Sequence, residues 1–360
     1  MLTFIIFLIV ISVLVLVHEA GHFIAAKRAG MKVEEFGFGF PPRLVGWRHR
    51  GTVYSINLIP FGGFVRIFGE NGENRNAPGS FGAGSFFAKV GVVVSGVAMN
   101  FLLAVVLLIL GSFLGLRVGI FDSATAARAT QTEVQILQVA PGSPAETAKL
   151  QPLDTILGFR QNGDLDVTAT PEDVQTFAYA HEGEAVTIVI GRGGTSQDIP
   201  LHLRQPLGPT EGPIGISLAL TGVIRYPWYE SIWRGIASAG LIFWGVLVGY
   251  WSILKSLIIS GSAGSDITGP VGIATLTGQA ARVGFNYLMQ FVAMISVNLA
   301  VLNILPFPAL DGGRLAIIVA EKLRGRSLSA HVEEAINAVG FAILIMLMIA
   351  VTIKDIVKFF

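Results

Sequence analysis

Four long apolar runs divide the chain, at about residues 2 to 26, 87 to 116, 285 to 305 and 336 to 353. Each run reaches or approaches the ~20 apolar residues that a helix needs to cross a bilayer. The pattern therefore predicts an α-helical polytopic membrane protein with four transmembrane helices, the third of which is broken and continues to residue 313.

A long, more polar stretch, residues 118 to 222, separates the second and third runs. Within it, short β-rich pieces such as 133–139 and 185–190 lie between Gly and Pro turns. Residues 171 to 180 have the pattern of a helix, with Thr170 as its N-cap. This stretch is therefore predicted to be a separate small α+β domain.

The segment from 223 to 284 has more than one interpretation. Its apolar centre, 241–251, has the composition of a fifth span, but four of the five tryptophans gather at 228–251. Tryptophans favour the membrane interface, which indicates an interfacial amphipathic helix or a re-entrant segment over 226–260. A full crossing would also move the end of the third run to the membrane face opposite residue 18. We therefore favour the interfacial interpretation.

Composition agrees with a membrane protein. Hydrophobic residues make up 52% of the chain and charged residues 14%, and the mean hydropathy is +0.66. A net charge of +1 argues against a nucleic-acid partner. The absence of cysteine excludes disulfides and cysteine chemistry.

Charges in the loops predict the orientation. Basic residues outnumber glutamates in the loop between the first two runs, residues 27 to 86, and no Lys or Arg precedes the first run. Positive charge favours the cytoplasmic side, so this loop is expected there. Both termini and the domain at 118–222 are then extracytoplasmic.

The first apolar run contains the motif His18-Glu19-Ala20-Gly21-His22. On a helix, His18 and His22 share a face and can bind one Zn²⁺, with Glu19 beside them as general base. The alternatives are a chance match and a cleaved signal peptide. The run lacks a basic region before it and is longer than the usual apolar core of a signal. Polar groups at membrane depth are also costly and rarely idle.

A catalytic zinc takes three protein ligands, and Asp311 is the candidate third. It follows the third run, at a depth similar to that of His18 if both helices enter from outside. Pro306 and Pro308 break the helix before it, and the backbone groups they free must line a protein-enclosed cavity. On its own, Asp311 before two glycines would be ordinary turn chemistry.

Candidate substrate contacts lie near this site. Asn298 and Asn303 carry amides suited to holding an extended peptide or an oxyanion, although helix-to-helix hydrogen bonding is an equal alternative for Asn298. Residues 52–59, with Tyr54 and Ile56, alternate like a strand and are predicted to receive substrate by strand addition. The alternative is a plain hairpin packed under the spans.

These motifs together resemble the site-2 protease family of intramembrane zinc metalloproteases, and within it the bacterial regulator of sigma-E protease. The resemblance covers nearly the whole chain. Residues 59–65, with Gly62 and Gly63, resemble the family's membrane-dipping β-hairpin, which implies contact with substrate. Residues 95–101 resemble the second-span motif, with Val97 where proline is usual.

Residues 139–157 resemble the PDZ fold of bacterial proteases. Lys149 and Leu153 stand where that pattern has glycine, which puts peptide binding in the usual groove in doubt. One such domain fits in 118 to 222, whereas enteric sigma-E proteases have two. The resemblance implies that the exported PDZ-like domain excludes untrimmed substrates.

The resemblance implies zinc-assisted peptide hydrolysis, with His18, His22 and Asp311 as metal ligands and Glu19 as base. The expected partners are single-span membrane proteins already trimmed outside, such as anti-sigma factors, remnant signal peptides, and the lipid bilayer. No organic cofactor is expected. Two rivals are an inactive scaffold that binds peptides through its PDZ-like domain and a zinc transporter. The scaffold would be expected to have lost Glu19 or a ligand, and the transporter would need a polar path through residues 2–17, which are almost wholly apolar.

Overall fold

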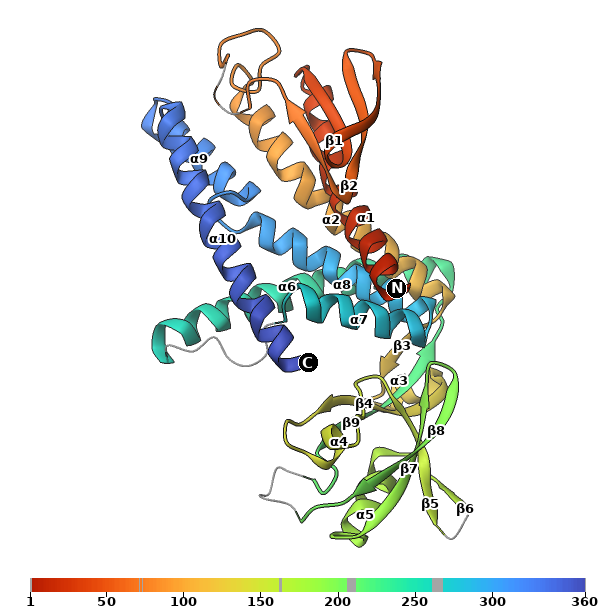
Figure 1. Cartoon of the computed structure of the whole chain (residues 1–360). Coiled ribbons are helices and arrows are strands. Elements are labelled where there is room, and N and C mark those ends of the chain that lie inside the picture. The colour runs from red at the N-terminus through yellow and green to blue at the C-terminus, as the bar shows by residue number, and fades with distance from the viewer. Residues whose placement is uncertain are drawn as a thin grey trace. The chain divides into compact units, whose positions relative to one another are not determined.

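The computed structural model describes residues 2–70, 72, 74–161, 164–205, 212–260 and 268–359 of the 360-residue chain (Figure 1). The chain divides into two compact units. Unit 1 comprises Met1–Leu108, Arg234–Gly278 and Phe291–Phe360, and unit 2 comprises Ile109–Trp233 and Gln279–Gln290.

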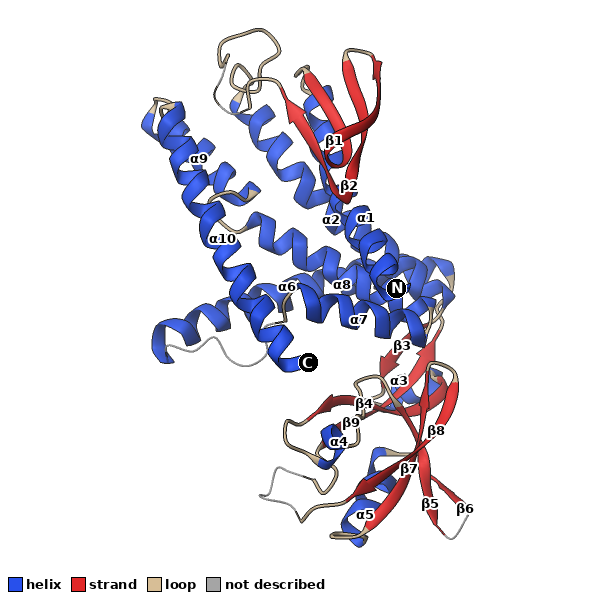
Figure 2. Ribbon diagram, viewed as in Figure 1, coloured by secondary structure: helices blue, strands red, loops and turns tan. Residues whose placement is uncertain are grey.

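Long helices correspond to the four predicted apolar runs (Figure 2). They are α1 (Leu2–Arg28), α2 (Phe86–Leu114), α8 (Phe285–Ile304) and α10 (Ala330–Phe359). Two shorter helices, α7 (Pro270–Val283) and α9 (Asp311–Arg324), flank α8 in the chain. The predicted break in the third run is confirmed, because α8 ends two residues before Pro306.

A fifth helix, α6 (Trp228–Ser260), is also long and apolar enough to cross a membrane, so the predicted count of four is not confirmed. Its 33 residues form one continuous helix, about 50 Å long at 1.5 Å per residue. A continuous helix has no turn within 228–260 at which the chain could re-enter. No residue in its most apolar window is buried in the protein.

The predicted hairpin after the first helix is a small sheet of two long strands, β1 (Val33–His49) and β2 (Thr52–Ile67). Both strands bend back on themselves and pair along three stretches. Residues 53–56 pair with 45–48 and also with 35–38, whereas residues 63–66 pair with 35–38 alone. We call residues 63–67 the edge segment. One side of this segment has no strand partner in the described part of the chain.

Close contacts hold this sheet against α1. Ser12 Oγ donates to the Pro60 carbonyl at 3.0 Å. Gly62 has a φ of +73°, and a Cβ there would lie 3.0 Å from the Val15 side chain. A Cβ at Gly63 would lie 2.8 Å from the Gly37 carbonyl oxygen. The two glycines therefore let the edge segment approach both α1 and β1.

Unit 2 is built on a seven-stranded sheet, which confirms an α+β region between the second and third runs. The strand order is β3-β9-β4-β5-β7-β8, with β6 paired to β5. The strands are β3 (Leu116–Gly119), β4 (Thr130–Val139), β5 (Thr155–Gln161), β6 (Asp164–Val167), β7 (Ala185–Arg192), β8 (Thr195–His202) and β9 (Ile216–Ile224). Its short helices are α3 (Ser123–Arg128), α4 (Pro144–Thr147) and α5 (Pro171–Ala180).

Helix α5 begins as the sequence predicts. The Thr170 hydroxyl accepts from the Asp173 amide at 3.2 Å, and the Asp173 carboxylate accepts from the Thr170 amide at 2.8 Å, which is a complete capping box. On its inner face, Phe177 stacks on the fully buried Phe159 with ring centroids 3.9 Å apart. Unit 2 therefore has an apolar core of its own.

The two departures from the expected glycine pattern, Lys149 and Leu153, both have left-handed backbone, with φ of 58° and 71°. Glycine adopts this conformation without the Cβ clash that other residues meet, which explains why it is usual there. The departures change the local strain and leave the chain path intact.

Candidate active site

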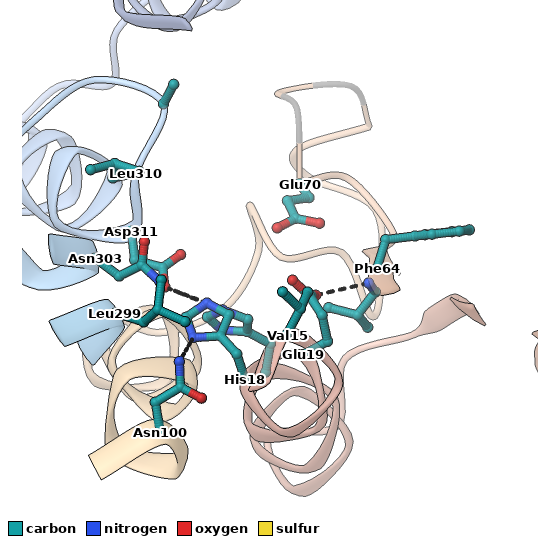
Figure 3. Close-up of a pocket in the computed structure, with 13 residues that line it drawn as sticks. Val15, His18, Glu19, Phe64, Glu70, Asn100, Leu299, Asn303, Leu310 and Asp311 are labelled. Atoms are coloured by element: carbon teal, nitrogen blue, oxygen red, sulfur yellow. Dashed lines mark hydrogen bonds and ion pairs between the residues drawn. The ribbon is translucent and has the colours of Figure 1, made fainter. Parts of the chain in front are cut away.

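Three potential metal ligands meet in unit 1 (Figure 3). His18 and His22 lie one turn apart on α1, and their Nε2 atoms are 3.1 Å from each other. Asp311, the first residue of α9, places Oδ2 at 3.0 Å from Nε2 of His18 and 3.3 Å from Nε2 of His22. The structure thus brings together the three residues predicted as ligands.

This triangle fits zinc. Ligand atoms about 2.0–2.1 Å from a tetrahedral zinc lie about 3.3 Å from one another, close to these separations. Oδ2 of Asp311 is buried and has no hydrogen-bond partner among the described residues. Two imidazole nitrogens and one carboxylate oxygen are a known zinc donor set that leaves a fourth position open.

The orientation of His22 is set by α2. Its Nδ1 lies 2.7 Å from the Val92 carbonyl oxygen, which can only accept, so Nδ1 carries the proton. In the neutral ring, Nε2 then presents a lone pair toward Asp311. A proton or a metal ion between Nε2 and the carboxylate relieves the repulsion of their lone pairs, so this orientation suits a metal ligand.

Asn100, which also belongs to α2, holds His18 of α1. Its amide nitrogen lies 3.4 Å from Nδ1 of His18, and its Oδ1 is buried without a partner among the described residues. Rotating the amide by half a turn presents Oδ1 as the acceptor that an Nδ1–H of His18 requires. Asn100 therefore fixes the ring so that Nε2 faces the metal position.

Two glycines allow α1 and α2 to come this close. A Cβ on Gly21 would lie 2.3 Å from the Ser95 carbonyl oxygen. A Cβ on Gly96 would lie 2.4 Å from Nε2 of His22 and 2.7 Å from Cε1 of His18. Any larger residue at either position would displace the histidines.

The loop after α8 presents Asp311. Side chains at Gly312 and Gly313 would lie 2.1 Å from the Leu305 carbonyl oxygen and 2.2 Å from that of Phe307. The loop therefore folds tightly over the first turn of α9, which no residue with a Cβ permits. This close packing explains the two glycines after Asp311 better than the ordinary turn that the sequence alone suggested.

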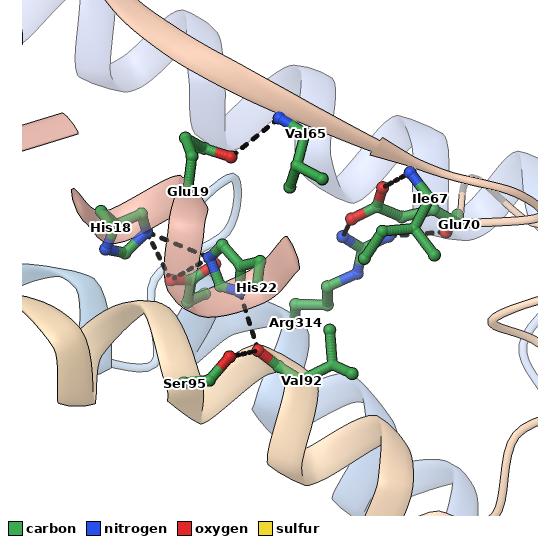
Figure 4. A network of polar contacts seen from close by, with 10 residues as sticks. His18, Glu19, His22, Val65, Ile67, Glu70, Val92, Ser95 and Arg314 are labelled. Atoms are coloured by element: carbon green, nitrogen blue, oxygen red, sulfur yellow. Dashed lines mark hydrogen bonds and ion pairs between the residues drawn. The ribbon is translucent and has the colours of Figure 1, made fainter. Parts of the chain in front are cut away.

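Glu19 lies beside the triad in a cavity of about 380 Å³. Its Oε2 accepts a 2.9 Å hydrogen bond from the Val65 amide, which belongs to the edge segment (Figure 4). The side of the edge segment that lacks a strand partner therefore faces the site. The cavity is lined by Val15, His18, Glu19, His22, Phe64, Val65, Glu70, Asn100, Leu299, Asn303, Ala309, Leu310 and Asp311.

Of the two predicted asparagines, the structure places Asn303 in this cavity and Asn298 outside it. Asn298 Oδ1 instead accepts from the Tyr250 hydroxyl of α6 at 2.6 Å. Five residues turn a helix by about 140° beyond a full circle, so the two side chains cannot face the same cavity. Helix-to-helix hydrogen bonding, the alternative for Asn298, is what the structure has.

The predicted receiving strand does not have a free edge. Residues 53–56, which include Tyr54 and Ile56, are paired on both sides. Tyr54 stacks on Trp47 with ring centroids 5.9 Å apart. The protein's own sheet thus occupies both edges of residues 53–56, which leaves no free edge there for the predicted strand addition.

Several cavity residues were not predicted: Val15, Phe64, Val65, Glu70, Asn100, Leu299, Ala309 and Leu310. Asn100 could have been predicted from the sequence. It falls within the motif at 95–101 and is a polar residue inside an apolar run, where polar groups are rarely idle. Val15 and Leu299 lie one helical turn before predicted site residues, on α1 and α8. The remaining residues are defined by strand pairing and loop geometry, which local patterns do not encode.

Residues 6–347 match the family described as Peptidase family M50. The chain belongs to peptidase family M50, the site-2 protease family. It is 36% identical over 354 residues to a Clostridium perfringens protein named "putative zinc metalloprotease", covering 97% of each chain. It is also 28% identical over 447 residues to zinc metalloprotease RasP of Oceanobacillus iheyensis, with full coverage of both. RasP of Geobacillus kaustophilus is 29% identical over 439 residues, covering 98% of this chain and 97% of that one.

Membership of family M50 identifies the chain as a zinc metalloprotease in a membrane. When bound, zinc polarises the scissile carbonyl and lowers the pKa of a bound water. Glu19 faces the same cavity, beside the three ligands, which is the position that a general base for an attacking water requires. The Val65 amide holds the Glu19 carboxylate in this position.

Proposed function

We propose that this metalloprotease cleaves peptide bonds in or near the transmembrane segments of single-span membrane proteins trimmed outside beforehand. Anti-sigma factors and remnant signal peptides are the substrate classes. The support is the placement of the site: His18 and His22 belong to an apolar helix able to span a membrane, and Leu299 and Asn303 belong to a second. A substrate approaching through lipid meets such a site before any aqueous peptide does.

The observation that carries the proposal is the hydrogen bond from Val65 to Glu19. Along a strand, alternate residues present their backbone groups to the same side, so Gly63 shares the outward edge with Val65. Ile67 faces the same way, but its amide is bonded to Glu70. A substrate helix that unwinds near the cavity gains backbone partners on this edge by strand addition. Its carbonyls then pass beside Glu19 and the metal ligands.

Asn303 is proposed to bind the substrate backbone or the oxyanion. Its amide lies in the cavity with Asp311, at the end of α8. A preorganised donor at such a position stabilises the charge that develops on the attacked carbonyl oxygen. Gly62 and Gly63 contribute by letting the edge segment lie against α1.

We propose the orientation predicted from the loop charges, in the bacterial cytoplasmic (inner) membrane. Both termini and unit 2 are then extracytoplasmic and the active site lies toward the cytoplasm. The start of α8 supports this side for unit 2, since Asn286 donates to the Gly115 carbonyl at 2.8 Å and Tyr287 to Gln135 at 2.8 Å. Unit 2 is the PDZ-like domain of the proposal and restricts access to trimmed substrates.

The test is cleavage of a single-span reporter by the full chain in membranes, with and without the reporter's outer domain. Wild type is expected to cut the trimmed reporter within or next to its span. Glu19→Gln is expected to abolish cutting, because an amide cannot accept the proton from water. Glu182→Gln, at an exposed position of unit 2, is the matched control and is expected to cut normally.

Equal cutting by wild type and Glu19→Gln would contradict the proposal. Cutting by wild type only in the loops, well away from the span, would leave a metalloprotease but overturn the intramembrane part. Equal cutting of trimmed and untrimmed reporters would overturn the role of unit 2.

A further inference from the structure

One ion pair joins the edge segment to the helix that carries Asp311 (Figure 4). Glu70, three residues after the edge segment, lines the active-site cavity and pairs with Arg314 of α9 through its carboxylate. The other carboxylate oxygen of Glu70 accepts from the Ile67 amide at 3.1 Å. Arg314 also donates to the Glu70 backbone carbonyl at 2.6 Å.

Arg314 is held in a single place by these contacts. Its guanidinium lies over the Phe81 ring, 5.0 Å from the centroid, and Phe81 is itself buried in the cluster that includes Ile318 of α9. The guanidinium therefore bonds a carboxylate and a carbonyl at once while it stacks on a ring. Lysine supplies the charge but neither the fork nor the flat face.

The pair closes a ring of contacts around the cavity. Glu19 of α1 bonds the Val65 amide, and the edge segment continues to Ile67, which bonds Glu70. Glu70 pairs with Arg314, one helical turn from Asp311 on the same side of α9. Asp311 faces the histidines of α1, where the ring began. These contacts connect the proposed general base, the substrate-binding edge and the third metal ligand, so a movement of one is transmitted to the others.

We propose that Glu70 and Arg314 are positioning residues, which hold the edge segment in register with the metal-binding end of α9. The inference rests on the proposed function, in which a peptide pairs with the edge segment. The edge segment places the peptide's carbonyl, and the metal is placed by His18 and His22 of α1 together with Asp311 of α9. The Glu70–Arg314 pair fixes the α9 ligand relative to that carbonyl. Neither residue contacts the reacting atoms.

The expected signature is a loss of turnover with little loss of binding. Without the pair, a peptide still has the same backbone partners, so KM changes little. The carbonyl then lies off its productive position, and a misplacement of about 1 Å costs about 10²-fold in rate. The zinc ligands are untouched, so zinc content stays at the wild-type level.

The matched control is Arg75, whose guanidinium ties the same loop to α9 and α10 through Glu321 at 3.2 Å and Glu333 at 2.7 Å. Arg75 does not line the cavity. If docking of the loop were all that matters, Arg75→Met would behave like Arg314→Met. The inference predicts near wild-type turnover for Arg75→Met.

The experiment uses the full chain in phospholipid vesicles with a trimmed single-span substrate, and measures kcat, KM and zinc per chain. Arg314→Met and Glu70→Gln are expected to lower kcat by about 10²-fold, with KM within about threefold of wild type. Arg314→Lys recovers part of the rate. The double variant is no slower than Arg314→Met, because the two side chains act as one unit.

The inference is overturned if Arg314→Met turns over within about threefold of wild type, if it loses zinc, or if Arg75→Met is equally slow. If Arg314→Met does not fold, Arg314→Lys and Glu70→Gln decide by the same criteria. A wild-type chain that cuts nothing overturns the proposed function and this inference together, whereas an active wild type with an equally active Arg314→Met overturns this inference alone.

Discussion

The active-site region of unit 1 and the sheet domain of unit 2 are stabilised in different ways. Unit 2 has a continuous apolar core in which Ile136, Phe159 and Ile188 are fully buried. The active site instead depends on a few buried polar atoms and on glycines that let backbones meet. An apolar core tolerates hydrophobic substitutions that keep its volume, whereas a hydrogen bond requires two particular atoms at a suitable distance and angle. The first arrangement supports a stable domain and the second supports precise chemistry.

The largest expected effect concerns the core of unit 2. Phe159→Ala removes a fully buried ring and its stacking with Phe177, and is expected to destabilise unit 2 by about 3–5 kcal/mol. Limited proteolysis of the full chain in membranes should show faster cutting in 130–202, with zinc content unchanged. A variant that loses zinc together with protease resistance would contradict the separation of the two regions.

The next effect concerns a single amide in unit 1. Val65→Pro removes the N–H that holds Glu19, and we expect the rate of reporter cleavage to fall by about 10²-fold while zinc is retained, as for other misplaced catalytic groups. Val65→Ala keeps the amide and is the control, with a rate near that of wild type. Equal rates for the proline and alanine variants would show that the amide is dispensable.

A smaller effect is expected at Asn100, which holds His18 from α2. Removing such an outer partner weakens metal binding by about 10–100-fold, so Asn100→Ala should lose zinc at lower chelator concentration than wild type. Asn298→Ala removes an amide that bonds Tyr250 away from the cavity, and should titrate like wild type. If both variants lose zinc alike, Asn100 has no special role.

The smallest effect tests local strain in unit 2. Lys149 is exposed and has a φ of 58°, so Lys149→Gly should stabilise unit 2 by about 1 kcal/mol. Lys149→Ala removes the same side chain without relieving the backbone and should give no gain. Denaturant midpoints of the two variants make the comparison, and equal midpoints would show that the backbone there is not strained.

Local signals in the sequence were enough for much of this architecture. The apolar runs gave α1, α2, α8 and α10, and Thr170 with Asp173 marked the start of α5. His18, Glu19, His22 and Asp311 came from helical spacing and from chemistry that is costly in a membrane. Most of these signals come from residues a few positions apart. Asp311 is far from His18 in the sequence and was predicted from its depth at the end of the third run.

Long-range pairing was not predictable in the same way. Alternation identified residues 52–59 as a strand, but it did not show that 53–56 are paired on both edges, because β1 bends back and pairs with them twice, through 35–38 and 45–48. Asn298 and Asn303 looked alike until the helix phase separated them. The tryptophans of α6 favoured an interface, although its length and apolar content equally suit a span. Such features depend on segments that are distant in the sequence.

The central claim is that His18, His22 and Asp311 bind one zinc ion, with Glu19 as the base beside them. The most direct measurement is zinc content of the purified chain for wild type, Asp311→Ala and Glu19→Gln, with cleavage of the trimmed reporter measured in parallel. We expect one zinc in wild type and in Glu19→Gln, little in Asp311→Ala, and cleavage by wild type alone. Full zinc content in Asp311→Ala, or cleavage by Glu19→Gln at the wild-type rate, would contradict the account.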